Sequence, residues 1–158
     1  MKKKLNTKSY IAIDPGKQGG IAYYDNKEGV GVRCPKTIYD MSMIFNVIMN
    51  SYKVAPDSIY LLIEHVHAFP TDGRSSVFTF GRNLGQWEGV IAGHEIEINI
   101  VAPKVWQKFY EIPKIPDKYE RKRWLKEKAI KLFSNTKVTL ANCDALLLLN
   151  YAKEKNNG

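Results

Sequence analysis

Residues 10–24 have the sequence Tyr-Ile-Ala-Ile-Asp-Pro-Gly-Lys-Gln-Gly-Gly-Ile-Ala-Tyr-Tyr, in which two short apolar runs flank a glycine-rich segment. The runs at 10–13 and 21–24 predict two strands joined by a turn, because Pro and Gly break the first strand. Asp14 ends that strand, beside a backbone that glycine leaves open to close approach. Such a carboxylate suits a hard cation and a phosphate, whereas a plain Asp-Pro-Gly turn is an equally good interpretation of these residues alone.

The segments that follow predict an α/β chain with one sheet. Residues 29–33 are expected to form a third strand, consecutive with the first two and antiparallel to them. Residues 39–52 place apolar side chains at spacings of three and four, which is typical of an amphipathic helix lying on a sheet. Residues 58–66 are almost continuously apolar, and this predicts a central strand covered on both faces.

Glu64 interrupts the apolar character of this central strand. A carboxylate buried at a strand end must be paired, protonated or bound to a metal. Alternatively, Glu64 already lies at the solvent edge of the sheet, or it pairs with Arg74 or Arg82. The sequence around it leaves these interpretations open.

A second helix is predicted over residues 76–93, where apolar side chains again recur every three or four positions. Gly81, Gly85 and Gly89 form a row along it, which allows close packing against the sheet or against a partner helix. A fifth strand is predicted over residues 96–101, with a short helix after it.

The chain has 158 residues, 44% of them apolar and 25% charged, as expected of one globular domain spanning residues 1–158. Its net charge of +8 points to a polyanionic partner, most often nucleic acid, and nothing in the sequence favours a membrane surface. Its two cysteines, Cys34 and Cys143, form no disulfide framework, and the lysine-rich N-terminus lacks the apolar run of a signal peptide. We therefore expect a cytoplasmic protein.

Residues 104–137 carry most of the excess charge, with eleven Lys and Arg against four Asp and Glu. A helix is predicted over residues 119–133, with one face mostly Lys and Arg and the other face directed inward. The inward face consists of Leu125, Ala129, Leu132 and Phe133. A basic helix face is often only solvated, but this one-sided surplus favours contact with phosphates.

The last helix is predicted to begin after Asn142, a natural N-cap residue, which places Asp144 in its first turn. Taken alone, Asp144 is best explained as a carboxylate that complements the helix dipole. Together with Asp14 and Glu64, however, it forms a set of three acids at the ends of elements. Three converging carboxylates would not all stay ionised without a cation, and oxygen ligands suit Mg²⁺ or Mn²⁺. On a basic protein, such a set suggests phosphodiester hydrolysis with two metal ions about 4 Å apart.

Other catalytic patterns are not favoured. His65 and His67 share a strand face, but without a third ligand at suitable spacing they do not make a zinc site. The chain has no phosphate-binding P-loop, no supported Ser-His-Asp arrangement and no pattern for an organic cofactor.

The sequence resembles the RuvC Holliday junction resolvases of the ribonuclease H-like superfamily, and most of all their phage-encoded branch. Five motifs in the family's order carry the resemblance and cover nearly the whole chain. They are Ile-Asp-Pro-Gly (13–16), Ile-Glu-His-Val (63–66), the segment 75–89, Ala-Pro-Lys-Val-Trp (102–106) and Asp-Ala-Leu-Leu-Leu (144–148).

The resemblance implies a five-stranded mixed sheet flanked by helices, a homodimer, and Mg²⁺-dependent nicking of four-way DNA junctions, with Mn²⁺ able to substitute. Asp14, Glu64 and Asp144 fall on the family's catalytic acids and would bind the metal. His67, with Phe69 close by, falls where the family places an aromatic residue near the junction centre. If the chain is phage-encoded, its location is the cytoplasm of a bacterial host.

Basic side chains are expected to hold the DNA through its phosphates. The candidates are Arg74, Arg82, Lys104, Lys108, Lys118, Arg121, Lys122 and Lys126.

One position departs from the family pattern. The family usually has an acid or histidine three residues before its last aspartate, and here that residue is Ala141. Asn142 or a displaced acid is a candidate substitute. The departure motivates an alternative function, a junction-binding module that has lost hydrolysis. A further alternative is a nuclease of the same superfamily that acts on structured RNA.

Overall fold

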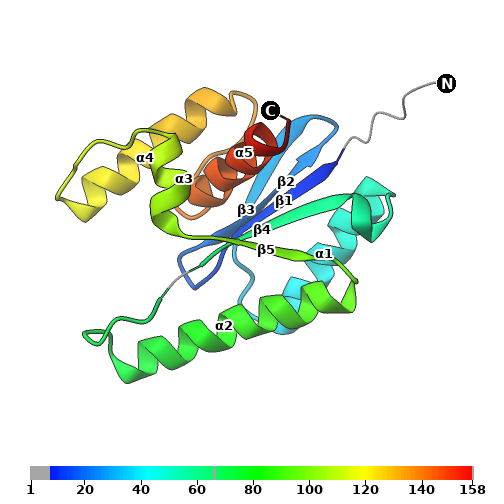
Figure 1. Ribbon diagram of the computed structural model, residues 1–158, viewed down its shortest axis with the longest axis horizontal. Coiled ribbons are helices and arrows are strands. Elements are labelled where there is room, and N and C mark those ends of the chain that lie inside the picture. Colours follow the sequence, from blue (N-terminus) through cyan, green and yellow to red (C-terminus); the bar gives the residue numbers. More distant parts are fainter. Residues whose placement is uncertain (1–7, 66, 158) are drawn as a thin grey trace.

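Five strands form one mixed sheet in the computed structural model, which describes residues 8–65 and 67–157 (Figure 1). The strands are β1 (Ser9–Asp14), β2 (Gly20–Asp25), β3 (Glu28–Arg33), β4 (Ile59–Glu64) and β5 (Ile98–Val101). Their order across the sheet is β3-β2-β1-β4-β5. The first three strands are antiparallel neighbours, and β4 runs parallel to both β1 and β5. The predicted five-stranded mixed sheet is confirmed.

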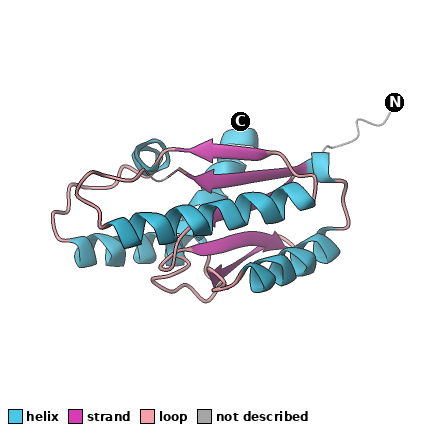
Figure 2. Cartoon of the chain, turned by 90° about the horizontal axis from the view of Figure 1, so that it is seen from below, coloured by secondary structure: helices cyan, strands magenta, loops and turns pink. Residues whose placement is uncertain are grey.

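Helices cover both faces of this sheet. They are α1 (Ile38–Tyr52), α2 (Arg74–Gly93), α3 (Pro103–Phe109), α4 (Lys118–Leu132) and α5 (Cys143–Asn157), and a 3-10 turn (Pro56–Ser58) precedes β4. Figures 1 and 2 show α1 and α2 on one face, and α3, α4 and α5 on the other. The sheet thus separates two hydrophobic cores.

The two cores follow from the alternation of side chains along the strands. Successive residues of a strand point to opposite faces, so odd and even positions of β1 are buried under different helices. Ile11 and Ile13 pack under α1 and α2, whereas Tyr10 and Ala12 pack under α3, α4 and α5. The central strands are covered on both faces, as the continuous apolar run of β4 predicts.

Two details of the helix faces differ from the sequence-based prediction. The glycine row of α2 points to open space, because a Cβ at Gly81, Gly85 or Gly89 would meet no atom within 4 Å. The prediction that this glycine row packs against the sheet is therefore wrong. Its packing against a partner helix stays a prediction. Leu132 is 43% exposed, since α4 ends there and Phe133 takes the buried position instead.

The predicted central strand is shortened at its end. β4 stops at Glu64, although the His65 amide still donates a hydrogen bond to the Val101 carbonyl at 2.8 Å. Val66 and the lysine-rich residues 1–7 lie outside the described residues. In the part of the chain that is described, no helix has the length and apolar character needed to cross a membrane.

Candidate active site

Strand alternation places Asp14 and Glu64 on the same face of the sheet. Asp14 follows Tyr10 and Ala12 at even spacing, and Glu64 follows Leu62, so both acids project toward α3, α4 and α5. The parallel pairing of Ile13 with Ile63 makes them the next residues on adjacent strands. The prediction that these two acids are neighbours is confirmed by this register.

Asp144 reaches the same region from the first turn of α5. A close approach between the loop before α5 and β2 helps to fix its position. A Cβ at Gly20 would lie only 2.9 Å from the Ala141 carbonyl oxygen, so glycine is needed for this contact. The structure therefore brings together residues from β1, β4 and α5 that are far apart in the sequence.

Asn142 stands at the predicted N-cap position, where its carbonyl accepts the first hydrogen bond of α5 from the Leu146 amide at 3.0 Å, and its side chain holds the preceding loop. Its amide group donates hydrogen bonds to the carbonyls of Gly31 and Lys137 at 2.7 and 3.0 Å, and its Oδ1 accepts from the Thr139 amide at 2.7 Å. Asn142 is only 2% exposed. These three hydrogen bonds hold the Asn142 amide against the loop and β3, so the structure gives no support to Asn142 as the fourth ligand.

The three acids influence one another strongly. Burial, followed by the charges of Asp144 and Glu64, raises the pKa of Asp14 well above its usual range, and the Lys122 ammonium only partly opposes this. Burial likewise raises the pKa of Glu64 to about 7, against the lowering effect of a hydrogen bond from Trp106. The cluster therefore has too much negative charge for its surroundings, which is what a cation site requires.

Trp106 holds the Glu64 carboxylate. Its Nε1 donates a 2.6 Å hydrogen bond to Glu64 Oε2, and Trp106 is completely buried. Glu64 is 8% exposed, and in the described part of the chain it forms no ion pair with Arg74 or Arg82. The interpretations of Glu64 as a solvent-edge residue or an arginine partner are therefore wrong.

Lys122 reaches into the acid cluster from α4. Its Nζ lies 2.7 Å from Asp144 Oδ2, and their side chains are 29% and 17% exposed. The charges of Asp144 and Asp14 raise the pKa of Lys122 even though burial lowers it. The sequence predicts this lysine as a contact to DNA phosphate, whereas the structure pairs it with an acid.

Mg²⁺ is the metal that the sequence resemblance implies for these acids. Within the described residues, no three His, Cys, Asp or Glu side chains already surround a common point. The residue types and their convergence nevertheless fit a hard cation, because Asp14, Glu64 and Asp144 supply only oxygen and repel one another in its absence.

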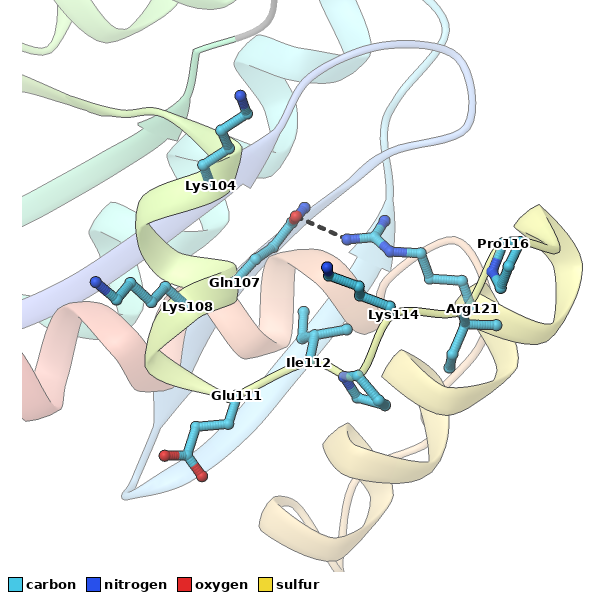
Figure 3. A pocket seen from close by; sticks show the side chains of 10 residues that line it. Lys104, Gln107, Lys108, Glu111, Ile112, Lys114, Pro116 and Arg121 are labelled. Carbon is cyan, nitrogen blue, oxygen red and sulfur yellow. Dashed lines mark hydrogen bonds between the residues drawn. The ribbon is translucent and has the colours of Figure 1, made fainter.

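A basic pocket is lined by residues of α3 and α4, the two helices that also contact the acids through Trp106 and Lys122. It has a volume of about 660 Å³ and lies between α3 and α4, where Figure 3 shows Arg121 reaching from α4 to Gln107 on α3, at 2.7 Å. Its lining includes the cations Lys104, Lys108, Lys114 and Arg121, together with the apolar Ile112, Pro113, Ile115 and Pro116. The Arg121 charge also lowers the pKa of Glu64, so this pocket is within electrostatic reach of the acids.

The other predicted DNA contacts lie on two helices. Arg74 and Arg82 are exposed on α2, while Lys118 is exposed and Lys126 half-buried on α4. Figures 1 and 2 both place the segment before α2 and the segment before α4 at the same end of the molecule. Figure 1 shows that this end also carries the last residues of β1 and β4.

His67 and Phe69 lie in the segment after β4. The rings of His65 and His67 pack edge to face with centroids 4.2 Å apart. Phe69 is 64% exposed, in a turn where its amide donates to Asp72 Oδ2 at 2.8 Å. Its exposure leaves the ring free to stack on a base, as the predicted role requires.

Two supporting residues were not predicted from the sequence. In the sequence Trp106 appears only as the last residue of the motif 102–106, with no role assigned to it, yet it is the hydrogen-bond donor to Glu64. Asn83 accepts a 2.8 Å hydrogen bond from the Gly16 amide and so ties α2 to the turn after Asp14. The sequence contains one signal for this role: Asn83 is a polar residue in the middle of the apolar face of α2.

Comparisons with known proteins agree with this geometry at the level of fold. No protein-family model and no curated protein sequence matches the chain. Among solved structures, Thermus thermophilus RuvC in complex with a Holliday junction substrate superposes with a TM-score of 0.61 and 11% identity over 96% of both chains. A second structure of Thermus thermophilus RuvC gives 0.58 and 10% over 94% of this chain and 96% of the other. The chain therefore has the ribonuclease H-like fold of RuvC.

Proposed function

We propose that this protein is a metal-dependent endonuclease that nicks four-way junctions and other branched DNA. The observation that carries the proposal is the convergence of Asp14, Glu64 and Asp144 on one face of a RuvC-like sheet, next to a basic pocket. Neither the acid cluster nor the basic pocket would support this function alone, because acid clusters also bind structural ions and basic pockets also bind other polyanions.

In this proposal the three carboxylates hold Mg²⁺, for which Mn²⁺ can substitute. When bound, the ion would polarise the scissile phosphate and lower the pKa of a bound water. The protein's own residues position the parts: Trp106 fixes the orientation of Glu64, and Asn83 fixes the turn after Asp14. Lys104, Lys108 and Arg121 would hold phosphates of the strand that enters the acid cluster.

Branched DNA requires a protein that contacts more than one arm, which a homodimer with two sites would do. The exposed glycine row of α2 and the 71% exposed Phe78 on the same helix offer a surface for a second copy. Dimerisation, the relation to the phage-encoded branch and the location in bacterial cytoplasm remain proposals that rest on sequence motifs.

A junction-binding module without hydrolysis is the second candidate. The ion pair of Lys122 with Asp144 favours it, because a lysine within the acid cluster competes with a metal for the carboxylate. Ala141, which supplies no ligand atom from its side chain, also favours it. The two candidates share their DNA surface and differ only in cleavage.

The experiment that separates them uses labelled four-way junction and matched linear duplex with Mg²⁺, Mn²⁺ or EDTA, resolved on native and denaturing gels. We expect metal-dependent paired nicks in the junction only. Asp14→Asn should abolish nicking and leave junction binding intact. Tight binding without nicks in either metal would favour the binding module, and preference for structured RNA in competition would favour the ribonuclease.

A further inference from the structure

We propose that the ammonium group of Lys122 serves as the second cation of the acid cluster, so that each chain binds one divalent ion instead of two. This inference rests on the proposed function, because it concerns how the same three acids are neutralised. It differs from the two-ion arrangement that the resemblance implies.

The oxygen atoms available in the cluster suffice for one ion. Trp106 Nε1 donates a hydrogen bond to Glu64 Oε2, and Lys122 Nζ donates one to Asp144 Oδ2. The remaining carboxylate oxygens are those of Asp14, Glu64 Oε1 and Asp144 Oδ1, the last of which also accepts a 3.3 Å contact from the Cys143 thiol. Mg²⁺ binds through one or two carboxylates and keeps several waters, so these atoms suffice for one ion while Lys122 keeps its contact with Asp144.

A second ion lacks further ligands in this part of the structure. Both N–H groups of the neighbouring Asn142 amide donate to the carbonyls of Gly31 and Lys137, and its Oδ1 already accepts from the Thr139 amide. Ala141 has no donor atom in its side chain. A second divalent ion at Asp144 would therefore have to displace Lys122 and find its remaining ligands in water.

The balance of charges in the cluster also supports one divalent ion per chain. Three ionised carboxylates carry three negative charges, which one divalent ion and the Lys122 ammonium neutralise together. Two divalent ions beside a retained lysine would leave the buried cluster with excess positive charge, which is costly where water is scarce. Neutrality is thus reached with one ion only if the lysine stays.

The position of Lys122 is fixed by the packing of its helix. Leu125 and Ala129, on the next turns of α4, are buried in the core shared with α5, which carries Asp144. The distance of 2.7 Å to Asp144 is therefore set by two packed helices. An ammonium group has three donors, so Lys122 can keep Asp144 and still donate to a phosphate oxygen of bound DNA.

Counting bound Mn²⁺ tests the inference without relying on cleavage. Metal-free full-length protein is titrated with Mn²⁺ alone, and free Mn²⁺ is followed by electron paramagnetic resonance. We expect one Mn²⁺ per chain for the wild type. For Lys122→Met we expect binding tighter by on the order of tenfold, or a second Mn²⁺, because a repelling charge is removed.

Junction cleavage by the same variants supplies the second readout. Lys122→Met should cut at least tenfold more slowly although it binds Mn²⁺ more tightly, and Lys122→Arg should recover part of the rate because it keeps the charge. Lys153→Met is the matched control: this half-buried lysine lies over the Tyr24 ring at 4.9 Å, outside the acid cluster, and its removal should change neither quantity.

The results that overturn the inference differ from the one that overturns the proposed function. Two Mn²⁺ ions on the wild type, or none, contradict it even if Lys122→Met fails to fold. Faster cleavage by Lys122→Met would show that the lysine only inhibits. A wild type that binds one Mn²⁺ but never cuts DNA would leave the ion count standing and refute the proposed function instead.

Discussion

Trp106 Nε1 donates a hydrogen bond of 2.6 Å to Glu64 Oε2 and thereby joins α3 to the last residue of β4. The bond is buried and lowers the pKa of Glu64, so it keeps part of the acid in the ionised form that a metal needs. We predict that Trp106→Phe lowers the free energy of unfolding by about 1–3 kcal/mol, because it leaves a buried carboxylate oxygen unpaired. The same variant should bind Mn²⁺ several-fold more weakly at pH 7.

Trp87→Phe is the matched control for this prediction. Trp87 is also completely buried, but it packs in the core under α1 and α2, on the opposite face of the sheet from Glu64. Its loss should reduce stability in urea titrations while leaving Mn²⁺ affinity unchanged. Equal effects of the two variants on Mn²⁺ binding would show that Trp106 acts only through packing.

The fold could be predicted because its signals are local. The apolar runs and the Asp-Pro-Gly break predict β1 and β2, and the continuous run before Glu64 predicts a central strand. Once β1 and β4 are parallel neighbours, strand period alone brings Asp14 and Glu64 together. The signals for the individual strands depend on residues within a few positions of one another.

The partners of the acids could not be predicted, because they depend on how helices dock. Trp106 is 42 residues from Glu64, and Lys122 is 22 residues from Asp144. Nothing in the basic helix distinguishes Lys122 from the lysines one turn away until α4 packs on α5. The glycine row of α2 was misplaced for a related reason, since glycine carries no apolar side chain to indicate a buried face.

The raised pKa of Glu64 predicts how stability depends on pH. Its value rises from an ordinary 4.5 to about 7 on folding, so the folded state holds a proton that the unfolded state releases between these values. Metal-free protein should therefore lose stability as pH rises from about 4.5 to 7, by on the order of 1–3 kcal/mol from this group. Asp14, whose pKa is also raised, acts in the same direction.

Comparison with Glu64→Gln isolates this contribution from other titrating groups. The glutamine variant should show a smaller loss of stability over the same pH range when unfolding is measured in EDTA. Saturating Mn²⁺ should reverse the wild-type trend, because the metal binds the ionised acids and stabilises the folded state. Identical pH profiles for wild type and variant in EDTA would contradict the assigned environment of Glu64.

Two glycines should respond in opposite ways to alanine. A Cβ at Gly20 would lie 2.7 Å from the Val32 carbonyl oxygen and 2.9 Å from that of Ala141, so Gly20→Ala should cost about 1–3 kcal/mol and displace the start of α5. Gly89→Ala meets open space within an exposed helix and should stabilise the monomer by about 1 kcal/mol.

Thermal unfolding measures both glycine effects, and sedimentation adds a test of the partner surface. If a second copy packs its helix against the glycine row, Gly89→Ala should weaken self-association even as it stabilises each chain. A gain in stability with unchanged self-association would place any dimer contact elsewhere on the surface.

The basic pocket predicts how junction binding depends on salt. Lys104 and Lys108 lie on α3, and both line the pocket beside Arg121. If each contacts one phosphate, the double variant Lys104→Gln/Lys108→Gln should reduce the slope of log K against log salt by about 0.9 per contact. Affinity should fall for junction and duplex alike, because phosphate contacts carry no base information.

Lys155→Gln is the control for this measurement, since Lys155 is exposed in the last turn of α5 and lies over the Phe109 ring at 5.5 Å. Its loss removes one positive charge, against two in the double variant, and should leave the salt slope within error of the wild type. A reduction half as large as that of the double variant would mean that net charge, rather than the pocket, governs binding. An unchanged slope in the double variant would move the DNA path toward α2, where Arg74 and Arg82 are exposed.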